Sequence, residues 1–401
     1  MKKIMIETLQ IIRNRLSQRP DELKKARESG VKVLGWSGYN IPEEIIYALG
    51  IIPIRIAIGG DEKLVEVGAR YISTRNCVYV RELLGLIDEG KDPYIKNIDV
   101  YAFDATCLQT FRTAELVEFY FKKDVFVLGV PRNFYWDEAK EYFINEAKDF
   151  TAKLEEKTGL TLDAGKLEDA IRLYNKTRET LIRIYAYQAS RNNVITWDEV
   201  YEIIQAGYFL DRKEYLSLLE QTLDELITLQ ENSAVTEDEN EVRLFISGSI
   251  IPPGDRKLIN IIKKLGGRIV GDDLWSGIIP YLDLNIEEPT IAGVALGYLN
   301  RTPHGALPYL DLQSDRRLKK MFELIDEFNA QGVIYHTLRY CDPYTFKAKE
   351  TKDVLAKRKI PFLEIHTEYA GSDIEAIRTR IEAFLEMIQN TTTLQYEKVS
   401  L

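Results

Sequence analysis

Short apolar segments alternate with amphipathic helical segments in two stretches of the chain, and this pattern limits the possible fold more than any other feature. Helices separate four predicted strands in the first stretch, at 31–36, 51–58, 98–103 and 125–130. Helices also separate four predicted strands in the second stretch, at 242–246, 268–270, 333–335 and 360–365. Repeated strand–helix alternation is typical of a doubly wound parallel sheet. The sequence therefore predicts an α/β fold with two doubly wound lobes.

The region between these two stretches is predicted to be helical. Residues 136–232 carry helical periodicity with almost no strand pattern, and the polar, acidic segment 231–241 predicts a linker. A charged helix is predicted at 2–29, interrupted near Pro20. We therefore expect four parts: an N-terminal helical segment at 1–30, a first α/β lobe at 31–135, a helical module at 136–240 and a second α/β lobe at 241–401.

Composition excludes several classes of protein. The 401 residues are 45% hydrophobic and 29% charged, as in an ordinary globular protein, and the net charge is −10. No basic block stands out, so we expect no nucleic-acid partner. No apolar segment approaches the roughly 18 residues needed to span a bilayer. The chain starts with an amphipathic helix and not with an apolar signal core, so we expect no membrane association and a cytoplasmic location.

The segment 332–346 carries the clearest candidate site. Its apolar residues 333–335 predict a buried strand, and polar residues then follow abruptly, beginning with His336. Cys341 comes next, and Asp342-Pro343 predicts a turn. In an open parallel sheet, ligands bind at the carboxyl ends of the strands. A thiol is therefore expected where such a sheet binds its ligand.

The chain has three cysteines, Cys77, Cys107 and Cys341. They are far apart in the sequence, no C-x-x-C pair is present, and an odd number argues against a disulfide framework. Three buried, inert thiols would be one interpretation. The other rests on placement, because each cysteine lies at a predicted strand or helix end among polar residues, where a cleft between lobes would collect them. Three thiolates without a fourth would leave one iron of a 4Fe–4S cluster open to another ligand.

Several segments, in order along most of the chain, resemble the 2-hydroxyacyl-CoA dehydratase and benzoyl-CoA reductase subunit family. The segment 35–50, GWSGYNIPEEIIYALG, is similar to the opening signature of that family. The three cysteine segments are similar to those of its cluster ligands, at 76–77, 106–107 and 335–341. Two later segments are similar to its closing signature, at 361–364 and 378–386. Each match alone is weak, but their order makes the resemblance specific.

The resemblance implies a cofactor and partners. It implies flavodoxin-like lobes, with a 4Fe–4S cluster between them held by Cys77, Cys107 and Cys341. It also implies a dimer with a like subunit, either identical or paired. A separate ATP-dependent iron–sulfur activator would deliver one low-potential electron.

The implied chemistry explains the open iron. The β-hydrogen of a 2-hydroxyacyl thioester is barely acidic. One electron into the thioester carbonyl would give a ketyl radical that can expel the 2-hydroxyl group, and the β-proton then becomes acidic. An open iron can hold the carbonyl or hydroxyl oxygen as a Lewis acid while it passes that electron. The expected substrate is therefore an acyl-CoA.

The chain departs from the family pattern at several positions. Ser37 stands where many relatives have cysteine, although relatives similar to the substrate-binding dehydratase subunit have serine there. Pro303-His304 stands where Pro-Cys is common, and Arg55 lies near the place of an acidic residue in dehydratase subunits. The Arg55 difference weakens the dehydratase interpretation specifically. Three cysteines are also too few for the branch with a larger double-cubane cluster.

Ser37 and His336 are the candidate catalytic residues beside the cysteines. Ser37 follows a predicted strand, where it could hydrogen-bond a substrate oxygen or simply cap the turn before the helix at Pro42. His336 could orient the cluster or act in acid–base catalysis, or it could be a hydrogen-bonded buried histidine.

Three functions stay open. The first is an iron–sulfur lyase that dehydrates a 2-hydroxyacyl-CoA by radical chemistry. The second is a benzoyl-CoA reductase-like enzyme, or another ATP-dependent reductase of small molecules, on the same scaffold. The third is an electron-transfer or maturation protein without its own substrate. A cleft beside the open iron would distinguish the two enzymes from the third function.

Overall fold

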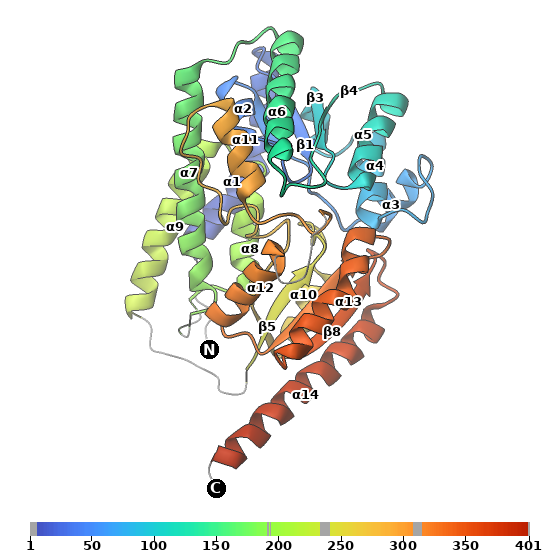
Figure 1. The fold of residues 1–401 in the computed structure, drawn as a ribbon, viewed down its shortest axis with the longest axis vertical. Coiled ribbons are helices and arrows are strands. Elements are labelled where there is room, and N and C mark those ends of the chain that lie inside the picture. The colour runs from blue at the N-terminus through green and yellow to red at the C-terminus, as the bar shows by residue number, and fades with distance from the viewer. Residues whose placement is uncertain (1–5, 191, 193, 233–240, 308–314, 400–401) are drawn as a thin grey trace.

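Two parallel sheets of four strands each organise the fold (Figure 1). The computed structural model describes the chain except for residues 1–5, 191, 193, 233–240, 308–314 and 400–401, and except for the side chains of 391–399. The eight strands lie at the eight places predicted from the sequence, with boundaries that differ by a few residues. The α/β prediction is therefore confirmed.

The first sheet has the strand order β2-β1-β3-β4, and all its neighbouring strands are parallel. Its strands are β1 (Val33–Ser37), β2 (Ile52–Arg55), β3 (Val100–Asp104) and β4 (Asp124–Leu128). The helices among them are α2 (Glu43–Ala48), α3 (Glu62–Gly68), α4 (Val78–Glu89), the 3₁₀ helix Ile95–Asn97 and α5 (Leu108–Phe121). The order reverses direction between β1 and β3, which opens a crevice at their carboxyl ends.

The second sheet repeats this arrangement with the order β6-β5-β7-β8. Its strands are β5 (Val242–Gly248), β6 (Gly267–Asp272), β7 (Gly332–Leu338) and β8 (Phe362–Thr367). Its helices are α10 (Lys257–Lys264), α12 (Arg316–Glu327), α13 (Asp342–Lys357) and α14 (Ile374–Val399). Helix α11 (Ile291–Asn300) lies in the same part of the sequence but packs against α6 and the core of the first sheet. The corresponding crevice lies between β5 and β7. The end of α14 projects from the body of the molecule (Figure 1).

Helices alone occupy the chain between the two sheets, within residues 137–232 that the structure describes. They are α6 (Asp137–Thr158), α7 (Ala164–Tyr187), α8 (Trp197–Ala206) and α9 (Arg212–Asn232). Helices α7 and α9 run side by side along one edge of the molecule (Figure 1). The proposed boundaries of the four parts stay a prediction.

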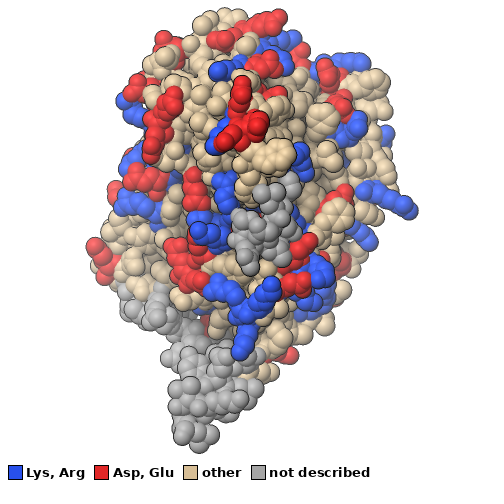
Figure 2. Space-filling view, viewed as in Figure 1, with Lys and Arg blue, Asp and Glu red and all other residues tan. Residues whose placement is uncertain are grey.

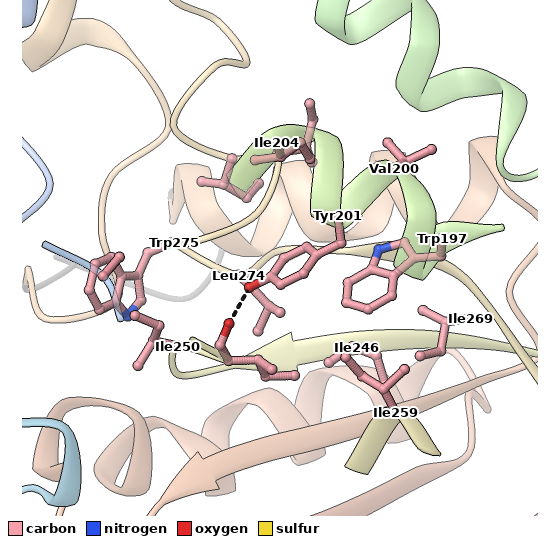
Figure 3. Packing of buried hydrophobic residues seen from close by; sticks show 14 of the residues in the cluster. Trp197, Val200, Tyr201, Ile204, Ile246, Ile250, Ile259, Ile269, Leu274 and Trp275 are labelled. Carbon is pink, nitrogen blue, oxygen red and sulfur yellow. Dashed lines mark hydrogen bonds between the residues drawn. The ribbon is translucent and has the colours of Figure 1, made fainter. Parts of the chain in front are cut away.

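Helix α8 packs against the second sheet and connects the helical region to it. The rings of Trp197 and Tyr201 stack with centroids 4.6 Å apart, and they pack over Ile246 and Ile269 of that sheet (Figure 3). The Tyr201 hydroxyl also lies 2.5 Å from the Ser276 hydroxyl. The same hydrophobic core includes residues of both sheets, so the two lobes and the helices are packed together as one structure.

The N-terminal helix α1 (Glu7–Glu28) passes through Pro20 without a break, so the predicted interruption is wrong. Proline has no N–H to donate to the carbonyl four residues earlier, which is that of Leu16. The Tyr94 hydroxyl donates to this carbonyl instead, at 2.7 Å. The lost helical bond is thus replaced from outside the helix.

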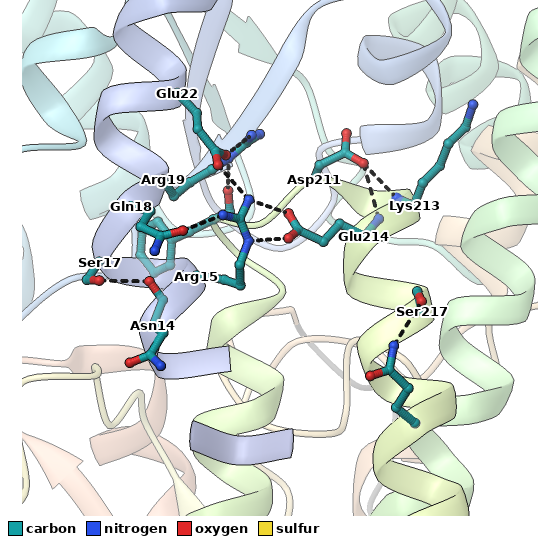
Figure 4. Close-up of polar contacts among 12 residues, drawn as sticks. Asn14, Arg15, Ser17, Gln18, Arg19, Glu22, Asp211, Lys213, Glu214 and Ser217 are labelled. Atoms are coloured by element: carbon teal, nitrogen blue, oxygen red, sulfur yellow. Dashed lines mark hydrogen bonds and ion pairs between the residues drawn. The ribbon is translucent and has the colours of Figure 1, made fainter. Parts of the chain in front are cut away.

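An ion pair also joins helix α1 to α9 (Figure 4). The Arg15 guanidinium donates to Glu214 of α9, and it lies 2.5 Å from Glu22 on its own helix.

On the face shown in Figure 2, acidic and basic side chains are interspersed. Across the described residues, none of the helices has both the length and the apolar character needed to cross a membrane.

Strand β7 continues beyond the predicted 333–335 to Leu338. It is paired on both sides, since His336 lies opposite Gly248 of β5 and Ile365 of β8. His336 is therefore a buried strand residue, and its predicted position beyond the strand end is wrong.

Candidate functional site

The three cysteines line one pocket between the two lobes. This pocket has an empty volume of about 540 Å³, and its lining includes Cys77, Cys107 and Cys341. The loops that follow β1 and β3 contribute Tyr39 and Cys107, and the loop that follows β7 contributes Cys341. The carboxyl-end crevices of the two sheets thus face each other across the pocket, as the crevice rule for open parallel sheets predicts.

Each cysteine immediately precedes a helix. Cys77 caps the start of α4, Cys107 the start of α5 and Cys341 the start of α13. The first-turn amides point at the sulfurs: those of Tyr79 and Val80 at Cys77, for example, and that of Tyr344 at Cys341. Free N–H groups at a helix start carry partial positive charge, which stabilises a thiolate. At each of the three cysteines these amides therefore act to lower the pKa of the thiol.

The thiols are close enough to influence one another. A hydrogen bond between Cys341 and Cys77 lowers the pKa of Cys77 and raises the pKa of Cys341 well above its usual range. Burial raises the pKa of Cys107, and the negative charge of Cys77 adds to that effect. Three thiolates cannot all lie this close together without compensating positive charge. A cationic metal centre would supply that charge.

The three thiols in the pocket lining are donors of the kind that an iron–sulfur cluster takes. Within the described part of the chain, no group of three or more His, Cys, Asp or Glu side chains is arranged to hold one metal ion. A 4Fe–4S cluster takes each cysteine at a different iron, so its ligands need not converge on one point. Three thiols from three helix starts, with amides directed at the sulfurs, fit that donor set.

The side chain of Gln109 links the three cysteine segments. Its Oε1 accepts a hydrogen bond from the backbone N–H of Cys77 at 2.7 Å, and its Nε2 donates to the carbonyl of Tyr340 at 3.0 Å. Gln109 itself lies two residues after Cys107 in the first turn of α5. One side chain therefore fixes the spacing of all three segments. No motif in the sequence indicates this role.

His304 lies in the same pocket, packed among three aromatic rings. The ring centroids of Tyr39, Trp275 and Tyr344 lie 5.4, 5.5 and 5.5 Å from that of His304. Burial lowers the pKa of His304 to about 3, so the ring is neutral near pH 7. Its Nδ1 accepts from the backbone N–H of Ala306 at 2.9 Å. The neutral ring therefore carries its proton on Nε2, where it is a hydrogen-bond donor.

Ser37 does not line the pocket, but it contacts Tyr79, which does. It is the last residue of β1, and only 2% of its surface is exposed. Its hydroxyl lies 3.1 Å from that of Tyr79, which lines the pocket. The Tyr79 hydroxyl donates to the Ile56 carbonyl at 2.5 Å, so Ser37 is the donor in the pair. Ser37 therefore orients Tyr79 and is not among the pocket-lining residues.

His336 is outside the pocket lining. It is fully buried in β7, and its Nε2 lies 2.7 Å from the Thr367 hydroxyl. Burial lowers its pKa to about 3, so it too is neutral near pH 7. The structure thus brings the three predicted cysteines together, places Ser37 behind Tyr79, and separates His336 from them. The pocket histidine is His304, whose position between Pro303 and Gly305 in the sequence indicates a loop that could line a cleft.

The fold and the site together define an α/β protein with a thiol-lined pocket between two parallel sheets. The sequence pattern of the family called "2-hydroxyglutaryl-CoA dehydratase, D-component" matches residues 38–388. The chain belongs to this family. The resemblance found in the sequence is thereby confirmed.

Several curated relatives are similar in sequence to this chain over nearly its whole length. A benzoyl-CoA reductase subunit of Thauera aromatica is 24% identical over 370 residues, covering 91% of this chain and 93% of the relative. The (R)-phenyllactyl-CoA dehydratase beta subunit of Clostridium sporogenes is 24% identical over 371 residues, covering 91% and 94%. The beta subunit of (R)-2-hydroxyglutaryl-CoA dehydratase of Acidaminococcus fermentans is 22% identical over 375 residues, covering 91% and 95%. The chain is accordingly a dehydratase-like enzyme, with a reductase as the alternative.

Proposed function

We propose that Cys77, Cys107 and Cys341 hold a 4Fe–4S cluster and that the chain uses it for one-electron chemistry on a CoA thioester. The preferred reaction is dehydration of a 2-hydroxyacyl-CoA. The observation that carries this proposal is that three thiols, from three helix starts in two lobes, line one pocket. When bound, the cluster would supply a low-potential electron and, at the iron without a cysteine, a Lewis acid.

The protein side chains would bind and orient the substrate. His304 is neutral, so its Nε2–H can donate to a carbonyl or hydroxyl oxygen without adding a buried charge. The rings of Tyr39, Trp275 and Tyr344 surround His304 and exclude water from that side of the pocket. Exclusion of water strengthens the hydrogen bond and protects a radical species. His304 is thus the preferred substrate-orienting residue.

Ser37 and His336, the two residues predicted to be catalytic, would have different roles. Ser37 would act through Tyr79, because its hydroxyl reaches the pocket only by way of that phenol. A catalytic role of His336 stays a prediction, since its side chain contacts Thr367 outside the pocket lining. His336 would then act on the site by fixing the end of β7, from which Cys341 follows.

The proposal also covers the fold of the lobes, the subunit assembly, the electron donor and the location of the protein. The strand order 2-1-3-4 in each sheet is that of the first four strands of a flavodoxin-like fold, so we infer flavodoxin-like lobes. The relatives named above are subunits, which supports assembly with a like subunit, identical or paired. An ATP-dependent iron–sulfur activator would reduce the cluster. A cytoplasmic location fits that partner.

A reductase is the second candidate. Arg55 is buried next to the cysteine pocket, where its Nη2 donates to the carbonyl of Trp275 at 3.0 Å. Arg55 stands near the place of an acidic residue in dehydratase subunits, so this position carries no general base for removal of a proton. A benzoyl-CoA reductase subunit is also among the relatives. Turnover with a 2-hydroxyacyl-CoA and with an aromatic acyl-CoA would distinguish the two reactions.

The experiment that tests the cluster is anaerobic purification with iron and sulfide analysis. We expect about four iron and four sulfide per chain, and loss of most of both in Cys77→Ala, Cys107→Ala and Cys341→Ala. Ser73→Ala, an exposed change four residues before Cys77, is the matched control and should keep the full content. A folded, anaerobically purified chain without iron would overturn the proposal.

A further measurement distinguishes the enzyme from a simple electron carrier. Electron paramagnetic resonance would follow reduction by a family activator with and without ATP. We expect reduction only with ATP, because a thioester carbonyl requires a very low potential. Equal reduction by a mild donor without ATP would favour the electron-carrier function.

A further inference from the structure

A second cavity lies beside the cysteine pocket and is lined by four arginines. Its empty volume is about 490 Å³, and the arginines are Arg55, Arg178, Arg212 and Arg301. They come from the first sheet, from helices α7 and α9, and from the segment after α11. Each is at most 6% exposed. So many buried cations around one cavity need an explanation, because burial of a charge is costly unless it is paired.

Two of the four arginines have carboxylate partners. Arg178 lies 2.6 Å from Glu44, and Arg212 lies 2.5 Å from Glu43. Arg55 and Arg301 form no ion pair with any described residue. Arg55 donates to the carbonyl of Trp275 at 3.0 Å, and Arg301 donates to that of Pro280 at 2.7 Å. Carbonyl groups satisfy hydrogen-bond donors but do not neutralise a charge. Glu43 also lines the cavity, but its carboxylate is already paired with Arg212.

The arginines also have donors to spare. Among the described residues, the Nε atom of each of Arg55, Arg178, Arg212 and Arg301 is buried without a hydrogen-bond partner. Unsatisfied buried donors are rare in native proteins, and a missing water or ion is a common reason. Four of them in the lining of one cavity indicate a bound group that accepts hydrogen bonds.

The aromatic lining leaves the guanidinium edges available. The Arg55 guanidinium lies 4.5 Å from the ring centroid of Tyr208, and that of Arg301 lies 4.0 Å from that of Tyr39. Such rings stack on the flat face of a guanidinium. A carboxylate binds instead at its edge, with two parallel hydrogen bonds. The two kinds of partner therefore do not compete.

We propose that this arginine cavity is a binding site for a carboxylate, held by Arg55 and Arg301. The cavity adjoins the cysteine pocket, because Tyr39 lines both and Trp275 connects Arg55 to the pocket. Two sources share this chemistry. One is a carboxylate at the far end of the acyl chain of a CoA thioester, and the other is a separate small organic acid. The first source rests on the proposed function, but the site itself does not depend on the cluster.

The test is thermal unfolding and calorimetric binding with the anaerobically purified full chain. At constant ionic strength, replacing chloride with acetate should raise the unfolding temperature by about 2–5 °C. Arg55→Met and Arg301→Met should abolish that rise. Arg172→Met, an exposed arginine on the same helix as Arg178, is the control and should keep it. If a methionine variant does not fold, Arg55→Lys replaces it, with an expected loss of affinity of about tenfold.

Two CoA thioesters distinguish the sources. Glutaryl-CoA carries a terminal carboxylate, and valeryl-CoA has the same chain length without it. If the acyl chain supplies the carboxylate, Arg55→Met weakens binding of glutaryl-CoA at least tenfold and leaves valeryl-CoA unchanged. If a separate acid binds, only the acetate response depends on Arg55. If wild-type protein responds to neither acetate nor the glutaryl carboxylate, the site does not exist, whatever the iron content of the same sample.

Discussion

The side-chain oxygen of Gln109 accepts a hydrogen bond from the backbone N–H of Cys77, with an N–O distance of 2.7 Å. The amide of the same side chain donates to the carbonyl of Tyr340, the residue before Cys341. These contacts span 32 and 231 residues of sequence. Gln109 thus joins two lobes at the point where their cysteines meet, and it does so with neutral groups that do not alter the charge of the site.

We predict that Gln109→Ala loosens the site without removing a ligand. Iron content should stay near that of the wild type, but loss of iron to a chelator should become several-fold faster. The electron paramagnetic resonance signal should broaden, because the sulfurs are held less uniformly. Gln221→Ala, on the surface of α9, is the control. If the spectrum and the chelation rate both match those of the wild type, Gln109 does not position the cysteines.

The two buried histidines make stability depend on pH. His304 and His336 each have a folded-state pKa of about 3, below the ordinary 6.5. Between these values the unfolded chain binds more protons, so the free energy of unfolding falls as the pH falls below 6.5. Each histidine contributes about 1.4 kcal/mol per pH unit once the pH is well below 6.5.

The difference between variants isolates this effect. We predict that chemical unfolding of His304→Phe shows a weaker loss of stability from pH 6.5 to pH 5 than the wild type. Gln221→Ala, a change without a titratable group on the surface of α9, should show the wild-type dependence. An unchanged slope in His304→Phe would mean that His304 is already charged in the folded protein.

Glu82 should change the free energy of unfolding with pH in the direction opposite to that of the histidines. Burial raises its pKa to about 8, above the ordinary 4.5, and its Oε2 has no partner among the described residues. The folded protein thus holds this proton more tightly, so the contribution to stability is lost as the pH rises from 4.5 through 8. Glu82→Gln keeps an acceptor for the Asp61 N–H and removes the buried charge. We predict that it raises the free energy of unfolding at pH 8.5 by roughly 1–3 kcal/mol.

The same comparison at pH 5 supplies the control for Glu82. There Glu82 is neutral in the folded protein, and the substitution should have little effect. Glu66→Gln, an exposed change on α3, should be neutral at both pH values. A destabilised Glu82→Gln protein at pH 8.5 would show that the carboxylate is needed in its ionised form.

The contact of Tyr94 with α1 can be tested by a double-mutant cycle. Tyr94→Phe removes the donor to the Leu16 carbonyl and should cost about 1–2 kcal/mol. Pro20→Ala restores a backbone N–H to that carbonyl, so Tyr94→Phe should cost less in the Pro20→Ala background. Urea unfolding of the four proteins measures both costs. Equal costs in the two backgrounds would mean that Tyr94 does not replace the missing helical bond.

Much of the fold is predictable because local patterns of apolar and polar residues indicate its strands and helices. The strands are short apolar runs between helical segments, and each lies near its predicted place. Helix α13 is not predicted, because Asp342-Pro343 is interpreted as a turn. Proline is also favoured in the first turn of a helix, which is where Pro343 lies. Helix α11 is not predicted either.

The site is predictable only in part, for a physical reason. Cysteines at element ends are expected to meet, since the carboxyl ends of parallel strands share one edge. The parts contributed by Gln109, His304 and Arg55 depend on contacts between segments that are far apart in the sequence. Polar residues of this kind have the same local pattern whether they face solvent or a pocket. Their roles therefore emerge only when the lobes are packed together.

The central claim is that three cysteines of this chain hold a four-iron cluster and leave one iron open. Mössbauer spectroscopy of the anaerobically purified, ⁵⁷Fe-enriched protein tests it most directly. We predict two kinds of iron in a ratio of about three to one, and a shift of the minor signal alone when an acyl-CoA is added. Iron in four equivalent sites, or no iron in a folded protein, would contradict the account.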